Sequence, residues 1–173
     1  MTPLGFALFE TAIGVCGIAW SDGGLISVQL PERNDDATRA RLARRCAGAH
    51  EALAPPEVQR AIDAIVSLLD GEATDLSFIT LDMDGVPDFH RRVYDVARTI
   101  RPGATLSYGD IAARLGDPGS ARAVGQALGR NPFVLVVPCH RVVAARGKTG
   151  GFSANGGTAT KLTLLAIEGA QLF

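Results

Sequence analysis

The sequence predicts a protein of the α+β class, in which strands come first and helices dominate the second half. Residues 5–10, 14–20 and 25–29 are typical of strands, because they are short, largely apolar segments separated by turns. The connection Ser21-Asp22-Gly23-Gly24 has the chemistry of a tight hairpin, since Asp-Gly tolerates the positive φ that such turns need. From residue 89 onward, apolar residues recur mainly at helical spacing. We therefore expect an α/β domain with an antiparallel sheet, followed by a mainly helical domain.

The first half is expected to contain two helices and one more strand. The helices are predicted over residues 36–50 and 56–69. In the second of them apolar residues recur at helical spacing, at Val58, Ile62, Ile65 and Leu69. Residues 76–81 have the composition of a further strand. Together these segments predict a small α/β unit built on an antiparallel sheet.

A loop at residues 83–88, which contains glycine and proline, predicts a joint between domains at 1–85 and 86–173. In the second domain, helices are predicted over residues 89–100, 108–115 and 120–128. Ser107 is placed to cap the middle helix. The last two helices are joined by a glycine-containing turn and predict a helix-turn-helix, whose second helix faces DNA.

The composition indicates a globular protein without membrane or secretion signals. Among the 173 residues, 47% are hydrophobic, which is enough to bury a core. No segment resembles a transmembrane span, and the N-terminus lacks the basic stretch of a signal peptide. The three cysteines, Cys16, Cys46 and Cys139, are few and odd in number, so we expect a cytoplasmic protein. Cys46 and His50, with Cys16 or His90, form only a loose metal-ligand pattern, and we expect no bound metal.

The charge is divided unevenly between the two halves. Residues 1–88 hold 6 arginines and 14 acidic residues, a net charge of −8. Residues 89–173 hold 11 basic and 4 acidic residues, a net charge of +7. This division predicts that only the second half meets a polyanion, with nucleic acid the leading candidate. The alternative is a charged face that serves solubility or docks the two halves together.

The predicted helix over residues 120–128 is built mostly from small residues, and Arg122 is its first long side chain. Small residues such as Ala123 and Gly125 let a helix approach a DNA groove closely, where Arg122 could enter the base stack. The alternative is that these residues pack the helix tightly against another helix. Both interpretations stay open at this level.

The segment Pro138-Cys139-His140-Arg141 places a thiol next to an imidazole, directly after an apolar run at residues 133–137 that we expect to be a buried strand. Cysteine is the best nucleophile among ordinary side chains, and a nearby histidine can take its proton. Seen alone, such a pair is more typical of a small buried cysteine with a structural role. The surrounding motifs favour the chemical interpretation.

These motifs occur in a specific order: Ser107-Tyr108-Gly109, Arg122-Ala123-Val124-Gly125, Asn131-Pro132, Pro138 to Val143, and Gly151-Phe152-Ser153. Together with the closing segment 161–169, they resemble the O6-alkylguanine-DNA alkyltransferases. The resemblance covers roughly residues 89–170, whereas the first half is similar mainly in size and layout. It implies a ribonuclease-H-like N-terminal domain and a winged-helix-like DNA-binding domain. It also implies transfer of an alkyl group from guanine O6 in duplex DNA to the protein's own cysteine, in a single turnover and without a cofactor.

By this resemblance, Cys139 is the nucleophile and the alkyl acceptor. We expect its sulfur to be unshielded, at the mouth of a cavity for an everted purine. His140 acts as the base through a bridging water, because neighbouring side chains point in different directions. Glu168 matches the carboxylate that orients the histidine, which is the logic of a catalytic triad. Asn131 matches the residue that supports the active-site turn and the helix-turn-helix.

The resemblance also assigns residues that hold the base. Tyr108 matches the tyrosine that helps to rotate the nucleotide and contacts the guanine edge. Arg122 matches the arginine that fills the gap left by the extruded base, and extrusion is required because guanine O6 lies within the stack. The backbone at Cys139 and Val142 accepts hydrogen bonds from the guanine amine. Ser153 matches a donor to O6.

The expected partner is therefore duplex DNA that carries O6-alkylguanine, with O4-alkylthymine as a further possible lesion. We expect a monomer with no obligate protein partner. Three other functions stay open: a lesion binder without chemistry, a cysteine hydrolase that uses Cys139 and His140, and a plain helix-turn-helix regulator. A hydrolase turns over repeatedly, whereas an alkyl acceptor stops at one equivalent.

Overall fold

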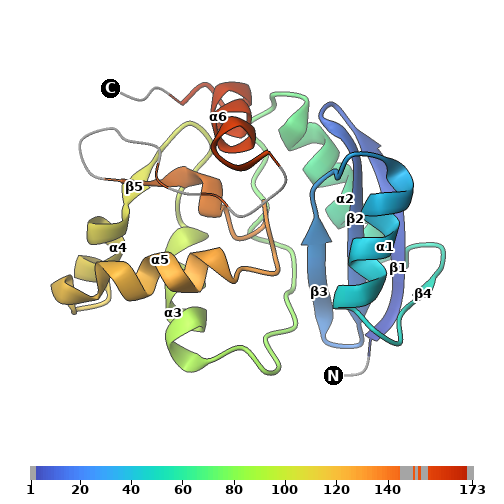
Figure 1. Cartoon of the computed structure of the whole chain (residues 1–173), viewed down its shortest axis with the longest axis horizontal. Coiled ribbons are helices and arrows are strands. Elements are labelled where there is room, and N and C mark those ends of the chain that lie inside the picture. The colour runs from blue at the N-terminus through green and yellow to red at the C-terminus, as the bar shows by residue number, and fades with distance from the viewer. Residues whose placement is uncertain (1–2, 145–149, 151, 153–155, 171–173) are drawn as a thin grey trace. The chain divides into compact units, whose positions relative to one another are not determined.

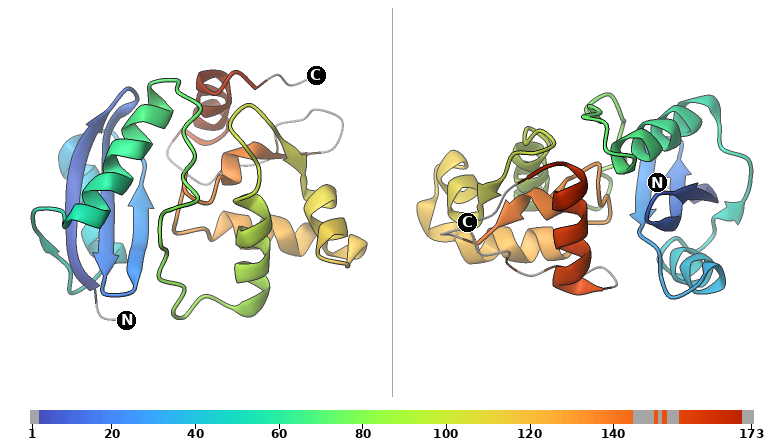
Figure 2. Two further views of the ribbon diagram at one scale, coloured as in Figure 1. Left: turned by 180° about the vertical axis from the view of Figure 1, so that it is seen from behind. Right: turned by 90° about the horizontal axis from the view of Figure 1, so that it is seen from above.

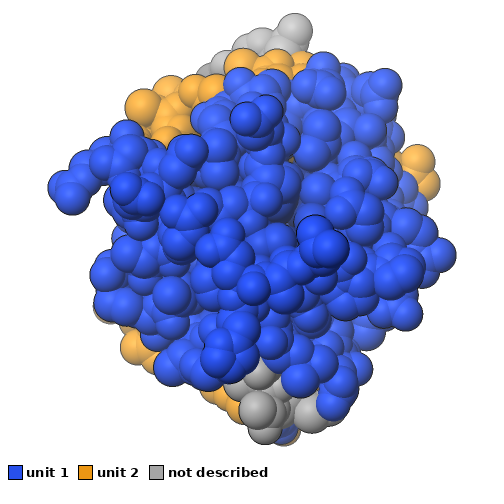
Figure 3. Space-filling view, turned by 90° about the vertical axis from the view of Figure 1, so that its right-hand side faces the viewer, with its two compact units in different colours: residues 1–84, 132–136 blue, residues 85–131, 137–173 orange. Residues whose placement is uncertain are grey.

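The computed structural model describes residues 3–144, 150, 152 and 156–170. The chain divides into two compact units, shown in different colours in Figure 3. The first unit contains residues 1–84 together with residues 132–136, and the second contains residues 85–131 and 137–173. A short piece of the later chain thus belongs to the first unit, which no local pattern in the sequence indicates. No helix among the described residues has the length and apolarity needed to cross a membrane.

The first unit is built on a four-stranded sheet in the order β3-β2-β1-β4 (Figure 1). Strands β1 (Pro3–Thr11), β2 (Gly14–Ser21) and β3 (Gly24–Gln29) are antiparallel, as predicted. The hairpin between β2 and β3 is confirmed, although its positive φ falls on Gly24. A Cβ atom there would lie 2.6 Å from the carbonyl oxygen of Thr80, so the position requires glycine for two reasons.

Two helices cover opposite faces of this sheet (Figures 1 and 2): α1 (Asp35–Arg45) and α2 (Pro56–Leu69). Strand β2 is accordingly buried on both faces. The helix predicted over residues 36–50 is too long, because the chain turns after Cys46 and continues as β4 (His50–Glu51), which pairs in parallel with β1. This pairing satisfies backbone groups that the extended helix would have used internally.

Two predicted strands are wrong. In the segment 76–81 only Leu81 forms a β-bridge, to Leu25, and the chain turns at residues 77–78, where the Ile79 N–H donates to the Leu76 carbonyl at 3.2 Å, so the segment is not a strand. In the run 133–137 Phe133 forms an isolated bridge to Val28, and Leu135 then adopts a positive φ of 73° that turns the chain. All of the run except Val134 is buried, as its apolar composition indicates, but burial alone does not distinguish a strand from a packed turn.

The second unit is mainly helical (Figures 1 and 2). Its helices are α3 (Asp88–Ala97), α4 (Tyr108–Arg114), α5 (Ala121–Gly129) and α6 (Gly157–Ile167), with short 3-10 turns η1 (Pro118–Ser120) and η2 (Cys139–Arg141). A parallel pair of short strands, β5 (Leu106–Ser107) and β6 (Val142–Val143), joins the start of α4 to the chain just after η2. The mixed class, with an antiparallel-rich sheet and a helical C-terminal part, is therefore confirmed.

The helix-turn-helix consists of α4, η1 and α5. Ser107 caps α4 as predicted: its hydroxyl accepts from the Asp110 N–H, and the Asp110 carboxylate accepts from the Ser107 N–H. Tyr94 on α3 donates from its buried hydroxyl to the carbonyl of Ala127 on α5, at 2.7 Å. This bond anchors the second helix of the motif to the rest of the unit.

Candidate active site

A sharp turn of the backbone presents Cys139. Pro138 has φ −80° and ψ 67°, the geometry of an inverse γ-turn, and the Cys139 N–H donates to the carbonyl of Val137 at 2.7 Å. The chain then forms the single 3-10 turn η2, in which the Val142 N–H donates to the Cys139 carbonyl. Proline supports the first turn because its ring fixes φ. Both backbone polar groups of Cys139, its N–H and its carbonyl, are therefore fixed by hydrogen bonds.

Asn131 connects this turn to the end of the helix-turn-helix. It lies two residues beyond α5, is buried, and donates from Nδ2 to the Val137 carbonyl at 2.9 Å. The same carbonyl accepts from the Cys139 N–H, so both of its lone pairs are used. Asn131 also forms a hydrogen bond with the Cys139 thiol. One amide thus links the helix-turn-helix, the turn and the sulfur.

Cys139 is only 8% exposed, so the expectation of an unshielded sulfur is wrong. Burial raises the pKa of its thiol, while the hydrogen bond with Asn131 and the positive charge of Lys161 lower it. Burial has the largest effect, and the resting group is a thiol rather than a thiolate. A neutral thiol is a poor nucleophile, so chemistry at Cys139 requires a base.

The base candidate, His140, is buried in an ionic network. Its Nε2 atom lies 2.9 Å from Oε2 of Glu168, which caps the C-terminal end of α6. The Arg141 guanidinium donates to the same carboxylate from Nε at 2.9 Å and from Nη2 at 2.7 Å, and its Nη1 donates to the Ile100 carbonyl at 2.7 Å. This bidentate geometry is the strongest form of arginine-carboxylate pairing.

The network determines which nitrogen of His140 is basic. Burial raises the pKa of Glu168, but the hydrogen bonds from Arg141 and His140 outweigh it and lower the pKa to about 2. An ionised carboxylate only accepts hydrogen bonds, so Nε2 of His140 carries the proton. Burial lowers the pKa of His140, more than Glu168 raises it, and the ring is neutral at pH 7. The remaining lone pair is on Nδ1, which is buried and forms no hydrogen bond within the described residues.

Tyr108, the first residue of α4, lies between two glycines. A Cβ atom on Gly125 would lie 3.8 Å from its ring, and one on Gly150 would lie 2.7 Å from its hydroxyl. Gly150 also has φ 71°. The close contact and the positive φ therefore both favour glycine at this position. Burial raises the pKa of Tyr108, and the charge of a Cys139 thiolate raises it further, so the phenol remains a hydrogen-bond donor.

Sequence reasoning assigned no role to Lys161, which is fully buried on α6. Its Nζ donates to the Val142 carbonyl at 2.6 Å and to the Tyr108 hydroxyl at 3.5 Å. The spacing contains a signal for this burial, because Lys161, Leu164 and Leu165 fall on one face of a helix. A lysine among apolar positions at that spacing indicates an inward-facing cation.

Three further predicted residues lie on α5. Arg122 is exposed near the start of the helix, and Ala123 and Gly125 are partly exposed. The buried face of α5 consists of Val124, Ala127 and Leu128. Two of the small residues therefore remain partly open to solvent and lie outside the buried face of α5. Ser153 lies outside the described residues.

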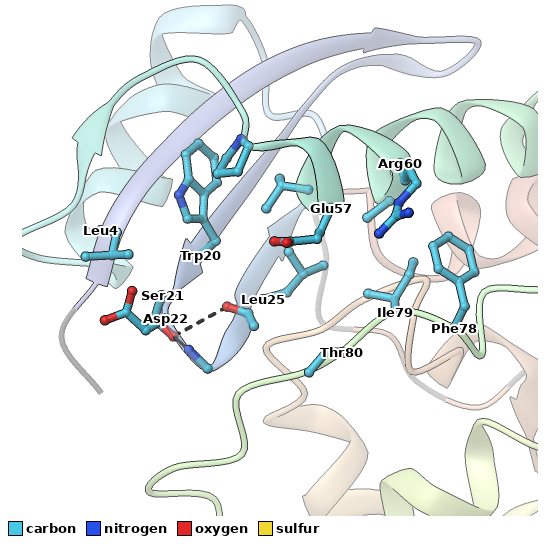
Figure 4. Close-up of a pocket in the computed structure, with 15 residues that line it drawn as sticks. Leu4, Trp20, Ser21, Asp22, Leu25, Glu57, Arg60, Phe78, Ile79 and Thr80 are labelled. Carbon is cyan, nitrogen blue, oxygen red and sulfur yellow. Dashed lines mark hydrogen bonds between the residues drawn. The ribbon is translucent and has the colours of Figure 1, made fainter.

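The first unit contains a separate pocket of about 410 Å³ (Figure 4), lined by the Ser21–Gly24 turn, the start of α2 and residues 78–80. None of the predicted site residues lines it, and all of them belong to the second unit or lie outside the described residues. In the part of the chain that the structure describes, no group of three or more His, Cys, Asp or Glu residues is placed to hold a metal ion.

Comparison with known proteins identifies relatives along nearly the whole chain. Residues 88–170 match the family described as 6-O-methylguanine DNA methyltransferase, DNA binding domain. A methylated-DNA–protein-cysteine methyltransferase of Methanothermobacter thermautotrophicus is 36% identical over 156 residues, which is 90% of this chain and 80% of that protein. The Mycolicibacterium paratuberculosis protein of the same name is 37% identical over 159 residues, covering 92% and 88%.

Solved structures agree with these sequence matches. The crystal structure of Mycobacterium tuberculosis OGT in complex with DNA is 32% identical, with a TM-score of 0.77, and covers 96% of this chain and 93% of that one. The O6-methylguanine-DNA methyltransferase of Pyrococcus kodakaraensis is 28% identical, with a TM-score of 0.72, covering 95% and 99%. This chain therefore belongs to the family of methylated-DNA–protein-cysteine methyltransferases.

Proposed function

We propose that Cys139 is the acceptor in a direct-reversal repair reaction, which removes the alkyl group from O6 of guanine in duplex DNA and restores the base. Family membership establishes repair of DNA by alkyl transfer to a cysteine. The observation that supports Cys139 as that residue is the buried network of His140, Glu168 and Arg141 next to it. Cys16 and Cys46 are also free and buried, but no histidine-carboxylate pair adjoins them among the described residues.

In the proposed step, Nδ1 of His140 takes the thiol proton through a bridging water. The thiolate of Cys139 attacks the alkyl carbon in line, so that the S–C bond forms while the C–O6 bond breaks. The bonding electron pair leaves on O6 of guanine, the proton that His140 took from the thiol passes to the guanine, and the normal base is restored. The alkyl group remains on sulfur as a thioether, and the protein is spent after one turnover. Glu168 stabilises the imidazolium that forms, as the third member of a triad does.

The remaining site residues act on the DNA in this proposal. Guanine must leave the base stack before a protein thiol can reach its O6 group, at a cost of a few kcal/mol. Exposed Arg122 fills the vacated space, and the small residues Ala123 and Gly125 allow α5 to enter the groove. Tyr108 and the Val142 carbonyl hold the guanine edge, and Ser153 donates to O6. Asn131 holds the active-site turn through its hydrogen bond to the Val137 carbonyl.

The protein is proposed to act as a monomer on duplex DNA, with O4-alkylthymine as a second substrate, and to need no cofactor. A cytoplasmic location is consistent with three cysteines that form no disulfide bonds. The net charge of +7 in residues 89–173 supports contact with DNA phosphates, so binding should tolerate many sequences and weaken steeply with salt.

Peptide mass analysis after incubation with a duplex that contains O6-methylguanine tests the acceptor. The wild-type protein should gain one methyl group, on the peptide that contains Cys139. Cys139→Ala should gain none and still bind the duplex, whereas the matched variants Cys16→Ala and Cys46→Ala should be methylated normally. A methyl group on another residue, or more than one equivalent of repaired base per protein, would refute the assignment.

A further inference from the structure

Lys161 is a buried cation that contacts two groups assigned above to the guanine edge. Its Nζ atom donates to the Val142 carbonyl at 2.6 Å and to the Tyr108 hydroxyl at 3.5 Å, and it lies 5.7 Å from the centre of the tyrosine ring. These groups come from three elements, α6, β6 and α4. A buried ammonium is costly, so its retention among apolar neighbours needs a compensating role.

We propose that Lys161 is a positioning residue that gives the site its selectivity for guanine, because it orients the Val142 carbonyl and the Tyr108 hydroxyl toward the base. This inference rests on the proposed function, in which the Val142 carbonyl accepts from the 2-amino group of guanine. Lys161 does not touch the reacting atoms in this role. It acts through the two groups that read the edge of the base.

The hydrogen-bonding capacity of each partner supports this role. A carbonyl oxygen has two lone pairs, so the Val142 oxygen can bind Lys161 and still accept from the base amine. The Tyr108 hydroxyl accepts from Lys161 and keeps its own proton for donation. Burial lowers the pKa of Lys161 to about 8, and the charge of a Cys139 thiolate raises it, so the Lys161 side chain is mostly a charged ammonium at pH 7. A charged donor holds both acceptors more firmly than a neutral one.

The backbone that carries these groups is already constrained, so Lys161 has to fix only the final orientation of the Val142 carbonyl and the Tyr108 hydroxyl. The Val142 N–H donates to the Cys139 carbonyl, and β6 pairs with β5 at Leu106 and Ser107. Tyr108 follows β5 directly and begins α4. Lys161 therefore connects the strand that follows the nucleophile to the helix that carries the tyrosine. Without it, the carbonyl and the hydroxyl lose their shared donor.

O6-methylhypoxanthine provides the test, because it differs from O6-methylguanine only in lacking the 2-amino group. Single-turnover rates are measured on two duplexes that differ at this base, for the full-length wild type and for Lys161→Met. The wild type should react faster with O6-methylguanine by about fivefold, the effect of one net hydrogen bond. Lys161→Met should lower this ratio to near one. Leu162→Ala, at an exposed neighbouring position on α6, should keep the wild-type ratio.

The alternative roles predict different results. If Lys161 only balances the charge of the Cys139 thiolate, Lys161→Met slows both substrates equally and the ratio stays at the wild-type value, which overturns the proposal. If Lys161→Met does not fold, as judged by circular dichroism, Lys161→Leu, which also lacks a donor, provides the same comparison, and an unchanged ratio again overturns the proposal. If the wild type reacts equally fast with O6-methylguanine and O6-methylhypoxanthine, the proposal is overturned without any variant. Failure of the wild type to transfer from either base would instead contradict the proposed function.

Discussion

Replacing Glu168 by glutamine tests how much the ionised carboxylate stabilises the site. The Glu168 side chain is only 3% exposed and accepts three charge-assisted bonds, one from His140 and two from Arg141. Its pKa falls from an ordinary value of 4.5 to about 2. At 1.36 kcal/mol per pKa unit, this shift corresponds to at most about 3 kcal/mol of folding free energy at pH 7. Because the pKa is lowered, that stabilisation is present above about pH 5 and disappears as the pH falls toward 2.

The free energy of unfolding, measured by urea denaturation with circular dichroism, should be lower in Glu168→Gln by about 3 kcal/mol at pH 7 and by about 1 kcal/mol at pH 3. Glu51→Gln is the matched control, because Glu51 pairs with Arg39 at 2.9 Å but the two side chains are 49% and 41% exposed. It should change stability by less than about 1 kcal/mol at both pH values. An equal loss at pH 7 and pH 3 in Glu168→Gln would show that the charge of the carboxylate is not what stabilises the network.

Three further predictions concern the same unit. Asn131→Ala removes the buried bond to the Val137 carbonyl, so it should lower the free energy of unfolding by about 1–3 kcal/mol and slow transfer in single-turnover assays; an unchanged rate would separate Asn131 from the chemistry. Gly150→Ala should slow transfer by displacing Tyr108, whereas Gly116→Ala, with a similar φ of 79° and no atom within 4 Å of its Cβ position, should not; equal rates would argue against the contact with Tyr108. Because burial lowers the pKa of His140 below its ordinary value of 6.5 and its neutral form is the base, the transfer rate should fall on acidification with a midpoint below pH 6.5; a rate that rises on acidification would exclude His140 as the base.

Much of the fold follows from patterns that act over a few residues. The Asp-Gly hairpin, the apolar face of α2 and the Ser107 cap each depend on neighbours within one or two turns, and all three were predictable. The limits of α1 and the conformation of residues 133–137 were not. In both places a distant strand, β1 or β3, binds the backbone and overrides the local preference.

The order of motifs along the sequence is sufficient to identify the family, the cysteine-histidine pair and the carboxylate that the chain folds against it. Only the tertiary structure places Arg141 on Glu168, selects Nδ1 of His140 as the basic nitrogen, and brings Lys161 to the Val142 carbonyl. These relations join residues that are 19 to 28 positions apart, and they depend on burial, which determines the charge of each group. A side chain's identity is written in the sequence, whereas its protonation state is set by the neighbours that exclude water around it.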